Sequence, residues 1–312
     1  MIIRITLALL VGIPAAMAYP WQSPADRWLL GVAIAMFIIV FAWWRGLFVT
    51  TIIARRISMV YRRNHTDGTR QATDYATVVL RVDPLNATDL PLGLVTGYID
   101  RYGISFDKVR VTSRDLDGAR MTWVGLTLRA ADNVSALRAR SPRIPLQDTV
   151  QIAARRLADH LREMGWEVEV AASDADKANH AAPVPEHGKE TWRGVTDGQG
   201  YVAAYRIAVD DKLADTLDAV WTCDSDETWT VLEITGSRIA PELAVACSIR
   251  TRDRPGPRAP LPGLTPERGR HRPALAVLGP VSDDRLPASP VRVPAELWSQ
   301  LQWPSGAALS RT

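Results

Sequence analysis

Three short acidic motifs are the residues best suited to chemistry in this sequence. They are Asp115-Leu-Asp117, Asp174-Ala-Asp176 and Asp224-Ser-Asp226. Two carboxylates this close can hold a divalent metal ion, and some glycosyltransferases use such a pair to bind a metal and a nucleotide sugar. All three motifs fall in segments that read as polar turns or loops. We therefore expect solvated turn residues and predict no catalytic residue and no metal site.

The remaining reactive side chains form no recognisable site. The five histidines are scattered without metal-ligand spacing. Lys189 follows Gly188 without the glycine loop that cradles phosphates in nucleotide-binding proteins. Two cysteines in 312 residues exclude a disulfide-rich scaffold, and a net charge of +3 is too small to indicate nucleic-acid binding. We predict no cofactor, no nucleic acid, no small-molecule substrate and no enzyme activity; the alternative is a membrane-anchored enzyme with a glycosyltransferase-like domain.

The strands and helices that must position these residues are predicted to occur in the same order twice. Alternating and helix-spaced apolar residues predict a first strand, helix, strand and strand at 75–83, 91–102, 104–112 and 121–129. The same order is predicted at 201–209, 211–221, 227–235 and 242–250. The fold class is therefore a mixed α/β domain, residues 73–252, with a duplicated β-α-β-β pattern.

A long amphipathic helix is expected between the two units. Its apolar stripe runs from Val150 to Met164, and Gly165 ends it. Asp148 is the expected N-cap, with Gln151 at capping-box spacing. A strand at 166–172 and a polar surface loop at 173–188 should follow.

The C-terminal segment, residues 253–312, has a different composition. Eleven of the 21 prolines lie between Pro255 and Pro304, and arginines dominate its first part. Such a segment cannot fold alone. Trp298 and Trp303 would gain nothing from exposure to water, so we expect this tail to dock on the domain or on a partner.

Two apolar runs precede the domain. Residues 5–21 carry no charged side chain, and residues 28–48 carry only Arg45. About 20 helical residues cross the hydrocarbon core of a bilayer. We predict a two-helix transmembrane hairpin at residues 1–48; the alternative for the first run is a signal peptide removed after Ala18.

Aromatic and basic residues at the ends of these runs indicate membrane anchoring. Indole rings prefer the headgroup level and a long basic side chain can reach out to it. The predicted membrane anchors are Trp21, Trp28, Trp43, Trp44 and Arg45.

The arginines around the second run predict the topology. Arg27 precedes it, whereas Arg45, Arg55, Arg56, Arg62, Arg63 and Arg70 follow within a short distance. The positive-inside rule then puts the large C-terminal domain in the cytoplasm, below the inner membrane. Residues 49–72 read as a basic juxtamembrane helix, which either contacts a partner helix or lies against lipid headgroups.

Several residues are candidates for contacts with other subunits. Gly31 and Ala35 form a small-residue pair that lets two transmembrane helices approach closely. The other candidates are basic residues of the juxtamembrane helix and tryptophans of the tail, namely Arg55, Arg56, Arg62, Arg63, Trp298 and Trp303.

Several longer stretches of the sequence form a distinctive set. They include Ala42-Trp43-Trp44-Arg45-Gly46, Leu80-Arg81-Val82-Asp83-Pro84, Gly97-Tyr98-Ile99-Asp100-Arg101-Tyr102-Gly103-Ile104, Ile144-Pro145-Leu146-Gln147-Asp148 and Gly269-Arg270-His271-Arg272-Pro273. Together these stretches resemble the EccE family of the actinobacterial ESX (type VII) secretion system. The resemblance covers almost the whole chain, and none of these stretches is a catalytic signature.

The resemblance implies a structural role in protein export. EccE-like subunits belong to an inner-membrane complex with EccB-, EccC- and EccD-like subunits, in which the EccC-like subunit is the ATPase. The pattern is nearest to the branch of ESX systems linked to iron and zinc acquisition. The implied partners of this chain are therefore those three subunits and membrane lipid.

Overall fold

A computed structural model describes most of the chain after residue 73. The described residues are 43–44, 47–48, 55–56, 74–85, 89–141, 145–171, 182–185, 187–294 and 297–304. The chain divides into two compact units, residues 1–68 and 69–312. The second unit is an α/β domain and is described by itself.

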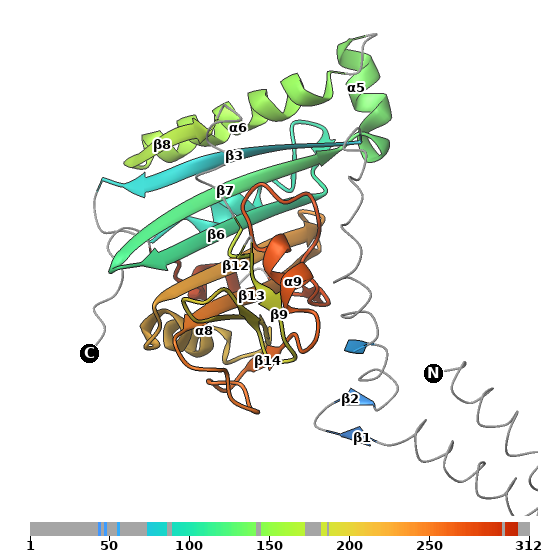
Figure 1. The fold of residues 1–312 in the computed structure, drawn as a ribbon. Coiled ribbons are helices and arrows are strands. Elements are labelled where there is room, and N and C mark those ends of the chain that lie inside the picture. The colour runs from blue at the N-terminus through green and yellow to red at the C-terminus, as the bar shows by residue number, and fades with distance from the viewer. Residues whose placement is uncertain are drawn as a thin grey trace, which may run out of the picture. The chain divides into compact units, whose positions relative to one another are not determined.

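The domain contains two successive β-α-β-β units (Figure 1). The first consists of β3 (Tyr75–Pro84), α4 (Leu92–Thr96), β6 (Lys108–Leu116) and β7 (Ala119–Arg129), with a small hairpin of β4 (Asp100–Arg101) and β5 (Ile104–Ser105) after α4. The second consists of β11 (Tyr201–Ile207), α8 (Leu213–Thr222), β12 (Glu227–Gly236) and β13 (Pro241–Thr251). The predicted duplication is thus present in the structure.

The remaining elements lie between and after these units. Between them are a 3-10 turn (Ala131–Asn133), α5 (Val134–Arg140), α6 (Leu146–Glu163), β8 (Trp166–Ala171), β9 (Lys189–Glu190) and β10 (Val195–Thr196). After them come β14 (Leu264–Pro266), α9 (His271–Val277), β15 (Val291–Arg292) and α10 (Leu297–Gln300).

One antiparallel sheet of 11 strands joins the two β-α-β-β units of the domain. Its main order is β8-β3-β7-β6-β12-β13-β11-β10-β9, with β14 beside β11 and β15 beside β13. Within each unit the third strand lies between the first and the second. The units meet where β6 pairs with β12, in a register that sets Arg110 opposite Glu233 and Ser113 opposite Thr230. Because this pairing is antiparallel, the two units are related by an approximate twofold rotation about the centre of the sheet.

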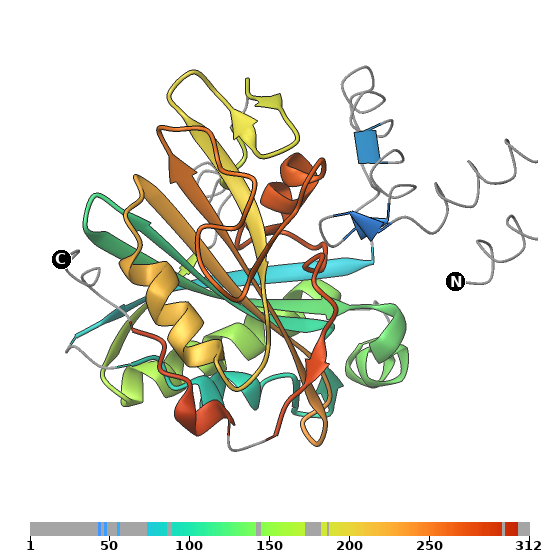
Figure 2. The same ribbon diagram turned by 90° about the horizontal axis from the view of Figure 1, so that it is seen from below.

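The face of the sheet that we call the helix face carries the main hydrophobic core. Helices α4, α6 and α8 pack on it, and Figure 2 shows α8 and α10 on the same side of the strands. Val109 and Val111 of β6, with Leu232 and Ile234 of β12, are fully buried beneath them. Alternation along the strands directs every second residue to this core.

The opposite face, which we call the α9 face, has a smaller apolar cluster. Leu275 and Leu278 at the end of α9 pack against Val202, Val231 and Ala246. Figure 2 shows α9 on the other side of the strands from α8. The strand residues that alternate with the main core therefore point toward α9 and the chain that follows it.

The helix predicted at 91–102 is much shorter in the structure. It ends at Thr96, and the chain then turns into the β4–β5 hairpin, whose two-residue loop is Tyr102-Gly103. Both loop residues have positive φ, 59° and 68°, as a type I′ turn requires. The conformational freedom of Gly103 therefore serves a hairpin turn and does not end a helix.

A second type I′ turn corrects the boundaries of the next strands. Asp117 and Gly118, with φ of 52° and 78°, close the hairpin between β6 and β7. The predicted strand at 104–112 is therefore displaced to Lys108–Leu116. The polar turn predicted at Asp115 is therefore wrong at this residue, because Arg114 and Asp115 are paired residues of β6.

Helix α6 begins earlier than predicted. Its N-cap is Pro145, with no side-chain capping bond, so the capping box at Asp148 is not formed. Asp148 lies in the first turn, where a carboxylate interacts favourably with the helix dipole.

The predicted membrane hairpin lies mostly outside the described residues. Within them, Trp43–Trp44 (β1) and Leu47–Phe48 (β2) pair as short antiparallel strands, so the prediction of a helix through residue 48 is wrong at these positions. Arg55 and Arg56 are helical, as predicted. None of the helices in the described part of the chain combines the length and the apolar composition needed to span a bilayer.

Candidate functional site

Asp115, the first aspartate of the three acidic motifs, does not lie in a solvated turn as predicted. It lies in β6 with 2% of its surface exposed. Both of its carboxylate oxygens accept hydrogen bonds from Arg120, at 2.6 and 2.8 Å. The Arg120 guanidinium also lies 5.0 Å from the ring of Trp221. The buried pair holds the end of the β6–β7 hairpin, and Asp117 alone of this motif is an exposed turn residue.

The other acidic motifs are placed differently. Asp224 is exposed just after α8, and Asp226 lies 3.5 Å from Arg252. Asp174 and Asp176 lie outside the described residues. Among the described residues, no group of three potential metal-binding side chains is found.

A second buried charge pair lies at the junction of the two β-α-β-β units. Arg110 of β6 and Glu233 of β12 form an ion pair on the α9 face, with side chains 2% and 1% exposed. The same guanidinium donates to four backbone carbonyls at the end of α9 and in the chain after it, those of Val277, Gly279, Ser282 and Asp284. Glu233 accepts a hydrogen bond from the backbone N–H of Leu286, at 3.1 Å. The pair therefore holds residues 277–286 on the sheet.

Two further charged residues hold the same segment. Lys108 is buried and its Nζ donates to the carbonyl oxygen of Asp284, at 2.5 Å. Burial, with repulsion from Arg110, lowers the pKa of Lys108 to about 8. Arg285 donates to the Asp107 carboxylate at 2.6 Å, and this hydrogen bond raises the pKa of Arg285. We call Lys108, Arg110, Glu233 and the Asp107–Arg285 pair the charged clamp.

The end of the tail lies on the helix face. Trp303 is fully buried, its Nε1 donates to Ser113 Oγ at 2.9 Å, and its ring meets Trp221 edge to face. Arg120 donates to the carbonyl oxygen of the next residue, Pro304. This burial leaves Trp303 no exposed surface for a contact with another subunit.

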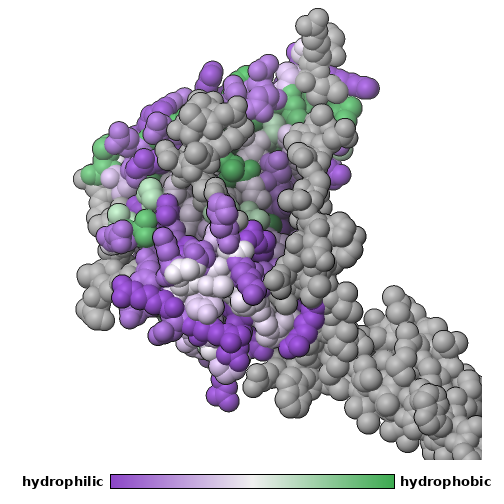
Figure 3. Space-filling model, viewed as in Figure 1, coloured by the Kyte–Doolittle hydropathy of each residue, from purple (hydrophilic) through white to green (hydrophobic). Residues whose placement is uncertain are grey.

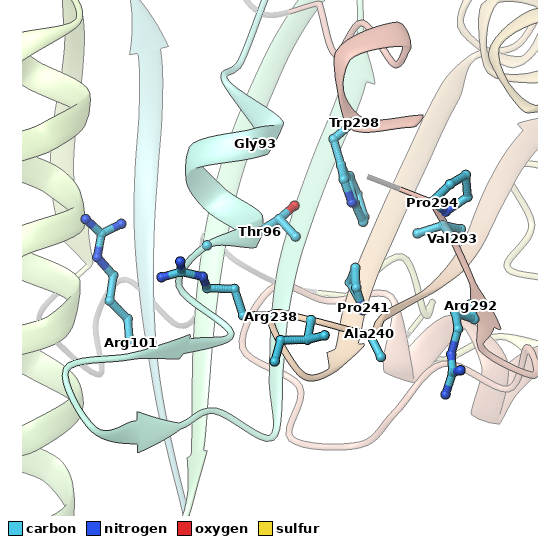
Figure 4. Close-up of a pocket in the computed structure, with 12 residues that line it drawn as sticks. Gly93, Thr96, Arg101, Arg238, Ala240, Pro241, Arg292, Val293, Pro294 and Trp298 are labelled. Atoms are coloured by element: carbon cyan, nitrogen blue, oxygen red, sulfur yellow. The ribbon is translucent and has the colours of Figure 1, made fainter. Parts of the chain in front are cut away.

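An open pocket lies where α4, the β12–β13 turn and the tail come together. Its volume is about 530 Å³, and Figure 4 shows Arg101, Arg238 and Arg292 among the residues that line it. Trp298, from α10, forms part of the wall. None of the described lining residues is acidic. The face of the domain in Figure 3 is mostly hydrophilic, with apolar residues scattered over it.

The structure brings together few of the residues predicted for partner contacts. Trp298 and Trp303 lie near opposite ends of the described final segment, one at the pocket and one in the core. Trp21, Trp28, Gly31, Ala35, Arg45, Arg62 and Arg63 lie outside the described residues. Their assignments stay predictions.

Sequence reasoning missed the charged clamp. Lys108 and Arg110 alternate with valines, which is typical of a strand with one face in water. The one available signal was Glu233, a charge in the middle of the otherwise apolar run Val231-Leu232-Glu233-Ile234. An isolated carboxylate in such a run needs a buried partner.

Comparison with known proteins gives a consistent result. A family model described as "Putative type VII ESX secretion system translocon, EccE" matches residues 117–207. The ESX-3 secretion system protein EccE3 of Mycolicibacterium smegmatis is 53% identical over 292 residues, covering 94% of this chain and 92% of that protein. EccE3 of Mycobacterium tuberculosis H37Rv is 48% identical, covering 98% of this chain and 92% of that protein. This chain therefore belongs to the EccE family of type VII ESX secretion system translocon proteins.

Proposed function

We propose that this chain is a non-enzymatic structural subunit of the inner-membrane core complex of an ESX-3 type of secretion system. The observation that carries the proposal is its identity of 48–53% to ESX-3 EccE3 proteins over nearly their whole length. In this role the chain supports assembly of the complex and export of its substrates, in the system that serves iron and zinc homeostasis.

The geometry of the domain suits a scaffold. One continuous sheet joins both units, and the charged clamp and Trp303 fasten the tail to its two faces. Buried ion pairs of this kind specify one arrangement of the chain through directional hydrogen bonds. A domain held in this way can present fixed surfaces to neighbouring subunits.

The proposal includes a membrane anchor and three partners. The two N-terminal apolar runs form a transmembrane hairpin, and the domain lies in the cytoplasm. The partners are EccB-, EccC- and EccD-like subunits, together with membrane lipid. The long charge-free run at residues 5–21 and the arginines after the second run support this topology.

Copurification tests the proposed role. The tagged full-length chain is purified from native membranes in a mild detergent, and the accompanying proteins are identified by mass spectrometry. We expect EccB-, EccC- and EccD-like proteins, and we expect deletion of the chain to stop ESX-3 export and growth on iron-limited medium. A tagged unrelated membrane protein is the control. Recovery of the chain alone, with export intact after deletion, would refute the proposal.

Cysteine labelling tests the topology. Cys223 is replaced by Ser and Cys247 by Ala, and a single cysteine is then introduced at Ser23 or at Ser135. Ser135 is exposed on α5 of the domain. A membrane-impermeant maleimide applied to intact cells should label only the cysteine at position 23. Labelling of position 135 would show that the domain lies on the other side of the membrane. In a separate measurement, an intact mass that lacks residues 1–18 would establish the signal-peptide alternative.

A further inference from the structure

The pocket beside α4 carries an excess of positive charge that the described domain does not neutralise. Arg101 follows α4, Arg238 lies in the β12–β13 turn, and Arg292 ends β15. None of these three arginines forms an ion pair with a carboxylate of the described residues. Arg101 is held in place by the rings of Tyr98 and Tyr102, at 4.7 and 5.4 Å.

Apolar groups lie among these charges. Ile239, next to Arg238, is 97% exposed, the most exposed large apolar side chain of the described residues. Trp298, Val293 and Pro241 contribute further apolar surface to the wall. The indole nitrogen of Trp298 is buried without a hydrogen-bond partner among the described residues. An exposed isoleucine beside a tryptophan and arginines has the composition of a protein interface.

We propose that this pocket binds an extended acidic segment of another subunit of the secretion complex. This inference rests on the proposed function, because it assumes that such subunits surround the domain. Carboxylates of the segment would pair with Arg101, Arg238 and Arg292, since a guanidinium binds a carboxylate through two parallel hydrogen bonds. An apolar residue of the segment would cover Ile239.

The arrangement of the arginines favours a peptide over a lipid headgroup. A phosphate requires donors that converge on one point, whereas Figure 4 shows Arg101 and Arg292 at opposite ends of the pocket. The volume of about 530 Å³ exceeds that of a single phosphate group. An extended chain advances about 3.3 Å per residue, so spaced acidic side chains can reach separate arginines.

Photocrosslinking in the assembled complex tests this proposal. The photoreactive residue p-benzoyl-phenylalanine replaces Ile239 in the full-length chain, and crosslinked peptides are sequenced by mass spectrometry after irradiation of cells. We expect an adduct with a translocon subunit at a segment that has two or more Asp or Glu within about five residues. The same substitution at Ile152, an exposed apolar residue of α6, is the control and should not give this adduct.

Three variants separate charge from shape. Arg238→Glu combined with Arg292→Glu should lower the yield of the adduct about tenfold, whereas Arg138→Glu on α5, also exposed, should not change it. Gly93→Leu should lower the yield by filling the pocket. A Cβ added at Gly93 meets nothing within 4 Å, and leucine favours the helix more than glycine does. Replacing the acidic residues of the crosslinked segment by lysine should restore the yield of the adduct in the variant that carries both Arg238→Glu and Arg292→Glu.

The outcomes distinguish this inference from the proposed function. If the wild-type chain copurifies with the other subunits but position 239 gives no acidic peptide, the acidic-segment proposal is wrong and the subunit role stands. A phospholipid adduct would also overturn it, as would a yield unchanged by the Arg238 and Arg292 substitutions. If the wild-type chain recovers no subunit at all, the proposed function itself fails.

Discussion

The two faces of the central sheet are covered in different ways. On the helix face, apolar side chains of both units pack under α4, α6 and α8. On the α9 face, Lys108, Arg110 and Glu233 of the same strands are equally buried, beneath the irregular segment 277–286. Val109 and Arg110 are neighbours in the chain, and both are at least 98% buried, yet Val109 belongs to the apolar core and Arg110 donates to carbonyl oxygens.

This difference shows two means of attaching a chain segment to a sheet. Apolar packing is non-directional and tolerates changes of shape at modest cost. A buried charge must be paired and hydrogen-bonded, so it specifies where the covering backbone lies. Residues 277–286 are held by directional bonds to fixed strand positions, which apolar packing alone does not supply.

Loss of the central clamp arginine should have the largest effect. Arg110→Ala leaves Glu233 buried without its cation and removes the donor of the Val277 and Ser282 carbonyls, so we expect a loss of about 4 to 5 kcal/mol in the free energy of unfolding. Pulse proteolysis in increasing urea, on the full-length chain in mild detergent, measures this loss. Arg81→Ala removes a half-exposed ion pair with Asp83 and should cost less than about 1 kcal/mol.

A double substitution sharpens that result. Arg110→Met with Glu233→Met removes both charges, so it should be less harmful than Arg110→Ala alone. It should not restore full stability, because the carbonyls of Val277 and Ser282 still lack the donor that Arg110 supplies. Equal losses in the single and double variants would show that the charge pair itself contributes little.

The corresponding test on the helix face is Trp303→Ala. Removing this fully buried indole should cost about 3 to 4 kcal/mol through the cavity that it leaves. Trp298→Ala, at a half-buried position, should cost about 1 kcal/mol. Both are measured by the same proteolysis. If the two variants lost equal stability, the tail end would not be anchored through Trp303.

Asp115→Ala tests a charge pair that lies on the helix face. It leaves the buried guanidinium of Arg120 without its carboxylate, and we expect a loss of about 2 to 3 kcal/mol. Asp224→Ala is the control, because Asp224 is exposed and should change stability by less than about 0.5 kcal/mol. Asp224→Ala should also leave export at the wild-type level. Lost export in a variant that folds and assembles normally would favour the enzyme alternative.

A pH titration tests Lys108 on the α9 face. Its pKa is lowered from 10.5 to about 8, so between these pH values the unfolded chain holds a proton that the folded protein has released. The Lys108 contribution to the free energy of unfolding therefore rises with pH, by about 2 kcal/mol between pH 8 and pH 9.5.

The comparison with Lys108→Met isolates this contribution. Burial raises the pKa of Cys247, which makes stability fall with rising pH above the ordinary thiol pKa and partly masks the lysine. Cys247 is unchanged in the variant, so the difference between wild type and Lys108→Met should rise across this pH range. A constant difference would mean that Lys108 titrates alike in the folded and unfolded chains.

The sequence predicted the strands and helices that have a clear apolar period. The strands β3, β12 and β13 and the helices α6 and α8 lie within a few residues of the expected ranges, because each has one apolar face. The helix expected at 91–102 was wrong after Thr96, since Tyr102-Gly103 is a hairpin turn, and the strand expected at 104–112 was displaced, since the next hairpin turns at Asp117-Gly118. Elements of the tail such as α9 have no regular spacing of apolar residues and were not predicted.

Burial on the α9 face was not readable from the pattern. Lys108-Val109-Arg110-Val111 alternates as an edge or half-exposed strand does, and local sequence cannot reveal that residues 277–286, more than 160 positions away, cover its charged side. The same is true of the pocket, whose arginines come from three separate segments.

The sequence by itself determined the two-unit α/β pattern, because the spacing of apolar residues is a local property that follows from strand and helix geometry. It also carried the resemblance to the EccE family, through motifs spread over the whole chain. Only the tertiary structure decided which charges are buried and which remain open to a partner. Arg110 and Arg238 look alike in the sequence, but the pairing of β6 with β12 brings Glu233 to Arg110, while the β12–β13 turn leaves Arg238 exposed beside the pocket.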